Sequence, residues 1–270
     1  MPFKVIWRFE RWSWANGNGF ENEEATQKVR GLLSEVPQCV SFGEDICAFL
    51  NPNLMVSTYP DTDRAGFMAY GGEYNDKIHI MVGLDSDRVA EALMHELLHA
   101  GLLRDGFPDC QFEGHEYDER GVLNYVQHEI MFPQYQEFSL DCGKFLGPID
   151  IQGQAEISEY LDDEACDFAF WCRQWCFDYQ YFNLVGDEIY IKWIDTEWRC
   201  VVEKFPRISD TVEMIKAWLE RGDYRKPQAF AAAYNELLAL MGMSSVPYDR
   251  WFRLEAGSHG LIPVKTNNMK

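Results

Sequence analysis

Residues 92–103 constrain this chain more than any other segment, because they place polar groups in an otherwise apolar stretch. His95, Glu96 and His99 are the only strongly polar side chains there. The remaining residues are Ala, Leu, Met and Gly, so a helix over this segment would be apolar on nearly every side, and we expect it to be buried. Burying two imidazoles and a carboxylate costs free energy unless something satisfies them. The fold must therefore provide partners for these groups.

The spacing of the two histidines points to a metal. Side chains four residues apart project from one face of a helix, so His95 and His99 can reach one ion together. Imidazole nitrogen suits Zn²⁺, which takes three protein ligands in catalytic sites and keeps one position open. Glu96 directly follows the first histidine, beside that open position. A carboxylate there can accept a proton from an attacking water and pass it to a leaving amine.

His95, Glu96 and His99 form the pattern His-Glu-x-x-His. In this pattern, and over about residues 75–133, the chain resembles the zincin metallopeptidases. The resemblance implies a zinc-dependent peptidase with an α+β fold, in which a small sheet with an edge strand precedes a buried active-site helix and a second ligand helix. In that family the strand before the active-site helix is an edge that binds extended peptide. Residues 77–82 would fill that role here.

The resemblance leaves the third zinc ligand to be identified. In thermolysin-like zincins it is a Glu on the next helix, about twenty residues after the second His. Glu119 lies at that distance from His99 and precedes apolar residues at helical spacing, which predicts that it shares their buried face. Glu119 is therefore the predicted third ligand. Leu123 stands where those enzymes carry an Asp, so the partner that orients an imidazole must come from elsewhere.

Other third ligands remain open. In the metzincin division the helix breaks at a Gly, and a His or Asp follows as the ligand. Asp105 occupies that ligand position, provided that the helix breaks early, at Gly101. Residues 130–135, which include Met131, resemble the methionine turn of the same division. The remaining candidates are His115, Glu116, His128 and Glu129, of which the two glutamates fit a resemblance to phage-repressor-cleaving metallopeptidases.

Patterning elsewhere predicts two domains, a zincin-like one over residues 1–150 and a smaller α+β region of unknown role over residues 151–270. In the first we expect strands at 4–9, 54–59 and 77–82 and helices at 24–33, 85–104 and 118–131, the last ending before Pro133. In the second we expect a hairpin of 188–194 with 198–205 and helices at 210–222, opened by a capping box, and 227–241.

The chain is strongly acidic. It carries 24 basic and 44 acidic residues, a net charge of −20. This charge argues against nucleic acid and anionic membranes as partners. Between residues 105 and 119 there are acids and no Lys or Arg: Asp105, Asp109, Glu113, Glu116, Asp118 and Glu119. Because this segment links the two expected metal helices, we expect it to rim the site and to favour basic peptide or protein substrates.

Eight scattered cysteines without a Cys-x-x-Cys pair predict buried, reduced thiols. No secretory signal or membrane-spanning stretch is visible, so we expect a cytoplasmic protein. The alternative to a peptidase is a zinc-stabilised structural or interaction protein with a vestigial site. A phage or virus component is one example, and residues 151–270 would then form its docking module. The sequence does not determine the oligomeric state.

Overall fold

The computed structural model describes the following residues: 10–12, 19–21, 37–50, 54–59, 66–71, 74–83, 89–110, 117–146, 160–164, 166–180, 184, 198–253 and 262–264. The chain divides into two compact units. Unit 1 contains residues 1–106, 133–145 and 253–262, and unit 2 contains residues 107–132, 146–252 and 263–270. The units are thus interleaved along the chain, unlike the predicted division near residue 150.

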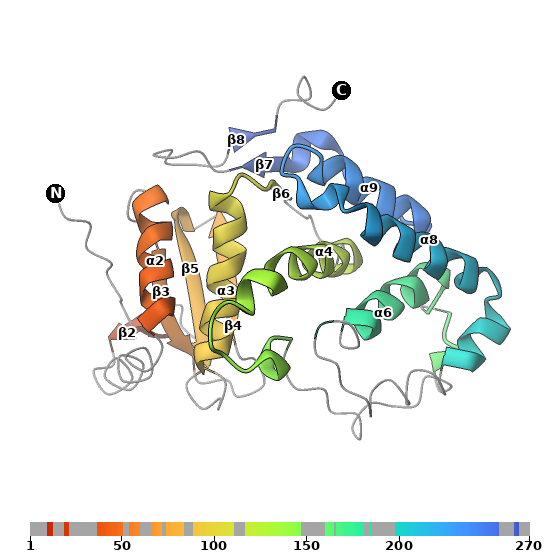
Figure 1. Cartoon of the computed structure of the whole chain (residues 1–270), viewed down its shortest axis with the longest axis horizontal. Helices are drawn as coiled ribbons and strands as arrows, with labels where there is room; N and C mark the ends of the chain where they lie inside the picture. The colour runs from red at the N-terminus through yellow and green to blue at the C-terminus, as the bar shows by residue number, and fades with distance from the viewer. Residues whose placement is uncertain are drawn as a thin grey trace. The chain divides into compact units, whose positions relative to one another are not determined.

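Unit 1 is built on a mixed sheet (Figure 1). Its strands are β1 (Glu10–Trp12), β2 (Gly19–Glu21), β3 (Leu54–Tyr59), β4 (Gly66–Gly71) and β5 (Tyr74–Gly83). Their order in space is β2-β1-β3-β5-β4, with β3 parallel to β1 and β5, and with β2 and β4 antiparallel to their neighbours. The prediction of a peptide-binding edge at residues 77–82 is therefore wrong, because β4 covers that side of β5.

Two helices accompany this sheet. Helix α2 (Pro37–Leu50) contacts β3, and helix α3 (Val89–Arg104) contacts α2, β4 and β5. The two helices approach closely at Gly101, where an added Cβ would lie 2.9 Å from Cζ of Phe42. From Ala92 to Leu103 every residue of α3 except His95 is buried. The expected buried helix is confirmed.

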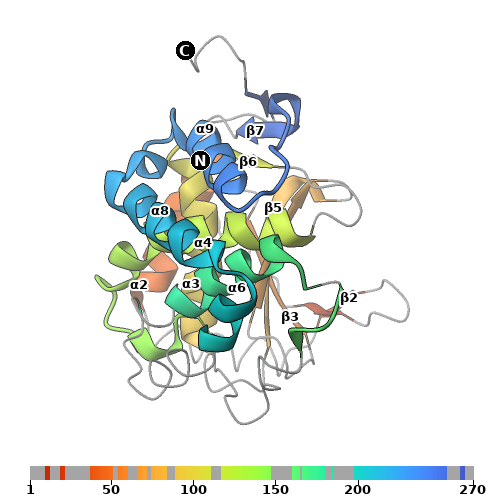
Figure 2. The ribbon, with the colours of Figure 1, turned by 90° about the vertical axis from the view of Figure 1, so that its right-hand side faces the viewer.

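Unit 2 is mainly helical (Figure 2). Its helices are α4 (Tyr117–Tyr135), whose last residues belong to unit 1, α6 (Phe168–Gln180), α8 (Arg207–Arg221) and α9 (Phe230–Leu240). A small sheet of order β6-β7-β8 joins β6 (Asp109–Cys110), β7 (Trp251–Arg253) and β8 (Ile262–Pro263). Its core is aromatic, since the Phe230 ring meets Phe107 and Trp251 edge to face and Tyr234 meets Trp251. The coarse α+β class predicted from the sequence is confirmed.

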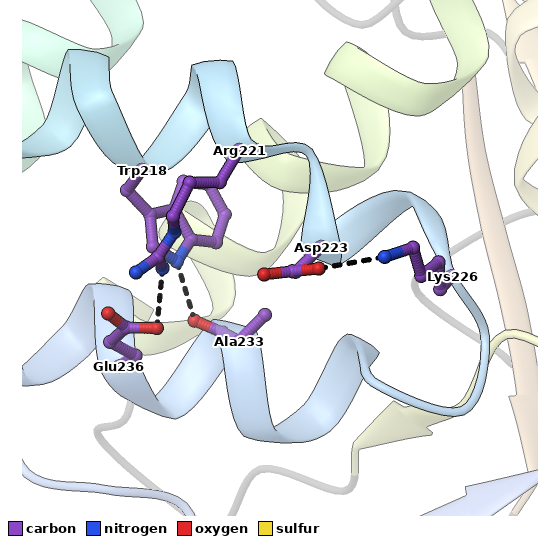
Figure 3. A network of polar contacts seen from close by, with 6 residues as sticks. All are labelled: Trp218, Arg221, Asp223, Lys226, Ala233 and Glu236. Atoms are coloured by element: carbon purple, nitrogen blue, oxygen red, sulfur yellow. Dashed lines mark hydrogen bonds and ion pairs between the residues drawn. The ribbon is translucent and has the colours of Figure 1, made fainter.

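Helices α8 and α9 are joined by one buried and one exposed polar contact (Figure 3). The indole Nε1 of buried Trp218 donates to the Ala233 carbonyl at 3.0 Å, and Arg221 pairs with Glu236 nearer to solvent. Gly222 ends α8 in the left-handed conformation, with φ of 66°. That conformation favours glycine and confirms the helix end expected there.

Two local predictions differ from the structure, and one helix was not predicted. Residues 198–204 are helical, not the second strand of a hairpin, and Trp198 and Val201 are buried three residues apart as a helix requires. Helix α2 was not predicted. Helix α8 begins at Arg207, with Pro206 at the N-cap and no side-chain capping bond, so the expected capping box is not formed.

Several other predictions concern parts outside the described residues, namely the segments 4–9, 24–33 and 188–194. Among the described cysteines, Cys142, Cys166, Cys172 and Cys176 are free thiols, and the last three of these are buried, as expected. In the described part of the chain, no helix has the length and apolarity needed to cross a bilayer.

Candidate metal centre

Helix α3 presents the imidazoles of His95 and His99 on one face. Their Nε2 atoms lie 3.2 Å apart, and the rings meet edge to face with centroids separated by 5.0 Å. His99 is buried and His95 half-buried. Two ring nitrogens at this distance either share a proton or face a common cation. The four-residue spacing therefore brings the two expected ligand atoms together.

A backbone carbonyl orients the first histidine. Nδ1 of His95 donates to the carbonyl oxygen of Phe145 at 3.0 Å, and the two rings pack with centroids 4.8 Å apart. A carbonyl oxygen only accepts, so Nδ1 carries the hydrogen and the neutral ring keeps its lone pair on Nε2. This is the arrangement in which metal-binding histidines are usually held.

The turn that supplies this carbonyl is itself fixed. Cys142–Lys144 form a 3-10 helix, with Asp141 as its N-cap accepting from the amide of Gly143 at 2.9 Å. At the end of α4, the Tyr135 hydroxyl donates to the Asp141 carbonyl at 3.2 Å, and the Tyr135 ring packs on Phe145. The C-terminal end of α4 is thus tied to the turn that holds His95.

Helix α4 carries a third histidine. His128 is seven residues before Tyr135, which is two helical turns, so both project from the same side of α4. His128 is 6% exposed. Its Nδ1 lies 3.3 Å from Oε1 of Gln180 on α6. This second imidazole is therefore also held through Nδ1 by an oxygen acceptor.

His95, His99 and His128 form a group that could hold a metal ion. Each offers one ligand atom, and these atoms all lie within 4.8 Å of one another. Two nitrogens bound to one tetrahedral Zn²⁺ at 2.0–2.1 Å are about 3.3 to 3.4 Å apart, which matches the His95–His99 separation. Three imidazoles suit zinc, copper, iron and nickel, so the donor set fits a transition metal.

Glu96 accompanies these ligands on α3. Glu96 is 8% exposed. It lies in the same turn of α3 as His95 and His99. A buried carboxylate needs compensating partners. Its place next to His95 is the one that the sequence pattern requires of a general base.

Glu119 is not a member of the histidine group. It is half-buried on α4, and its backbone carbonyl accepts a hydrogen bond from the Tyr234 hydroxyl. Glu119 precedes His128 by nine residues, or two and a half helical turns, so it projects from the opposite side of α4. Among the described residues, α4 contributes His128, and not Glu119, to the histidine group.

The other candidate ligands fall elsewhere. Asp105 is exposed and pairs with Arg104 at 2.8 Å, and α3 continues through Gly101 without the break that this ligand requires. Met131 lies inside α4 rather than in a turn, because the helix runs past Pro133 to Tyr135. These findings overturn the metzincin interpretation. His115 and Glu116 lie outside the described residues.

Glu129, the remaining candidate, is buried and directly follows His128, but it is not a member of the histidine group. Burial raises the pKa of Glu129 to about 7, although the charge of Arg225 and a hydrogen bond from Gln180 lower it in part.

Sequence reasoning did not identify Phe145 or Gln180 as partners of the histidines. They lie 50 and 52 residues away from the histidines along the chain, and no local pattern marks such contacts.

No protein-family model, curated protein or solved structure matches this chain.

Proposed function

We propose that this protein is a zinc-dependent peptidase in which His95, His99 and His128 hold the metal and Glu96 transfers protons. The observation that carries the proposal is the convergence of the three imidazoles in a buried setting next to a buried glutamate. Two of the imidazoles have an oxygen acceptor at Nδ1. Such acceptors orient metal ligands in known sites and make them more basic.

Each residue has a separate task in this proposal. A zinc ion at the site supplies Lewis acidity toward a peptide carbonyl and toward water. Glu96 accepts a proton as the water oxygen bonds to the carbonyl carbon, and delivers it to the amine nitrogen as the C–N bond breaks. The Phe145 carbonyl and Gln180 hold the ligand rings in place.

Strand β4 is the proposed docking strand for the substrate. It is an edge of the described sheet and contacts α3, the helix that carries His95 and Glu96. An extended peptide can add to such an edge through main-chain hydrogen bonds. In this proposal the substrate-binding edge is therefore β4, the neighbour of the strand that contains residues 77–82.

The decisive variant is Glu96→Gln, which removes the proton acceptor and keeps the shape of the side chain. We expect it to lower peptide hydrolysis by about 10²- to 10⁴-fold while the bound zinc, measured by elemental analysis, stays unchanged. Glu91→Gln, on the same helix, is the matched control and should hydrolyse like the wild type. Undiminished turnover in Glu96→Gln would refute the mechanism. Identical fragments from both forms in a proteome-wide assay would favour the structural or interaction protein.

A second experiment identifies the third ligand. We expect His128→Ala, like His99→Ala, to reduce zinc from about one ion per chain to nearly none at micromolar zinc, because two ligands hold the ion far less tightly. Glu119→Ala should retain its zinc. Loss of zinc from Glu119→Ala, with retention in His128→Ala, would restore the thermolysin-like ligand set. His115→Ala, measured in parallel, tests the candidate that lies outside the described residues.

A further inference from the structure

The side chain of Gln180 makes contacts in three directions at the end of α6. It is 1% exposed. Its amide Nε2 donates to the backbone carbonyl of Tyr125 at 2.6 Å, and a hydrogen bond from Gln180 also reaches the Glu129 side chain. Its Oε1 lies 3.3 Å from Nδ1 of His128. All three partners belong to consecutive turns of α4.

These contacts determine which end of the amide faces the histidine. If the amide were flipped, its oxygen would face the oxygen of the Tyr125 carbonyl, and two acceptors would meet in a buried place. Nε2 therefore faces Tyr125, and Oε1 faces His128. Because an amide oxygen only accepts hydrogen bonds, Nδ1 of His128 must be the donor.

We propose that Gln180 is a positioning residue that fixes His128 as the Nδ1–H tautomer and so leaves the Nε2 lone pair as its metal ligand. The role in metal binding rests on the proposed function. The tautomer does not, since it follows from the contacts of Gln180 alone. The contact also restricts rotation of the His128 ring, and it links α6 to the metal centre.

The same helix provides a matched control. Gln174 also uses its amide for a buried partner, donating to Oδ1 of Asp178 at 3.0 Å, but it has no contact with α4 among those described. Gln180→Met and Gln174→Met each remove one amide and preserve length and flexibility. Only the first removes the acceptor from His128.

The first readout is the tautomer of His128 in metal-free wild-type protein. The chain has six histidines. Nitrogen-15 NMR at about pH 8.5, with His128 assigned from the signal lost in His128→Ala, distinguishes a protonated Nδ1 from a protonated Nε2. We expect Nδ1–H in the wild type and in Gln174→Met, and a majority of Nε2–H in Gln180→Met. A wild-type His128 protonated at Nε2 would overturn the proposal.

The second readout is affinity for Co²⁺, followed by its visible absorption. Losing an outer partner of a ligating histidine costs about 10- to 100-fold in metal affinity, which we expect for Gln180→Met and not for Gln174→Met. Unchanged affinity in Gln180→Met would overturn the positioning role even if the tautomer were correct. Active hydrolysis in Glu96→Gln would instead refute the peptidase mechanism and leave the Gln180 assignment intact.

Discussion

At the scale of single residues, His95 and His128 are oriented by the same kind of contact. Each donates from Nδ1 to a neutral oxygen, the Phe145 carbonyl in one case and the Gln180 amide in the other. Neither acceptor carries a charge, so each ring is fixed in its tautomer without a carboxylate.

The buried cysteines of α6 lead to a prediction about reactivity. Cys172 and Cys176 are fully buried, and burial raises the pKa of Cys172 to about 12 and that of Cys176 well above its usual value. The thiolate is the reactive form, so a pKa near 12 rather than 8.5 leaves about 10³-fold less of it at neutral pH. Cys142 is partly exposed.

We therefore expect Cys142 to react with an alkylating reagent at least about 100-fold faster than Cys172 or Cys176 in the native protein. Peptide mass spectrometry after timed labelling measures the three rates. In urea the rates should become similar, which serves as the control. Equal rates in the native state would mean that the thiols of α6 are reached by solvent.

Residue-scale features were accessible from the sequence only where the pattern is local. The pair His95 and His99 and the adjacent Glu96 were predicted from one helical turn. His128 shares its face of α4 with Tyr135 seven residues later, but that spacing fits ordinary core packing equally well. Only the contact of His128 with Gln180, which belongs to a distant segment, singles out this histidine on α4.

At the scale of elements, the spacing of apolar residues correctly predicted α3, β3 and the helices near the C-terminus. The secondary-structure prediction failed in a segment whose aromatic and β-branched residues suggest a strand. Residues 198–204 are rich in such side chains and suggest a strand, yet they are helical, and the hydrogen bond from Trp198 Nε1 to Asp178 at 2.9 Å ties them to α6. Helix α4 was expected to end before Pro133 but continues through it to Tyr135. The one backbone donor that proline lacks is tolerated near a helix end when the residues on both sides of the proline are packed.

The contact between α2 and α3 leads to a second prediction. An alanine Cβ at position 101 would lie 2.9 Å from Cζ of Phe42, whose ring also packs on Phe138 and lies under the guanidinium of Arg104. Overpacking of this kind costs about 1 to 3 kcal/mol, more than the 0.5 to 1 kcal/mol that alanine gains over glycine in a helix.

Gly101→Ala should therefore be less stable than wild type by about 1 kcal/mol in urea unfolding. The double variant Gly101→Ala with Phe42→Leu should unfold nearer to Phe42→Leu alone, because the smaller side chain makes room for the methyl group. If Gly101→Ala were more stable than the wild type, helix propensity would outweigh the close packing of α2 on α3.

At the scale of the whole molecule, the net charge is −20, and two of the acids expected near the site have hydrogen-bonding or ionic partners of their own. Asp109, one of the acids expected there, is buried, and its carboxylate accepts from the amide of Cys110. Asp105 is exposed but pairs with Arg104. Attraction of cationic ligands must therefore come from the summed field of the acidic surface rather than from these two residues.

Under the proposed function, that field predicts which peptides would be hydrolysed best. A long-range attraction raises the rate of encounter with a basic peptide, and salt screens it over about 10 Å at 0.1 M. We expect kcat/KM for a lysine-rich peptide to fall about tenfold between 0.02 and 0.5 M NaCl, with kcat nearly constant. An uncharged peptide of the same length is the control and should change little. If an acidic peptide were cleaved as efficiently as the basic one at low salt, the charge would have no part in substrate choice.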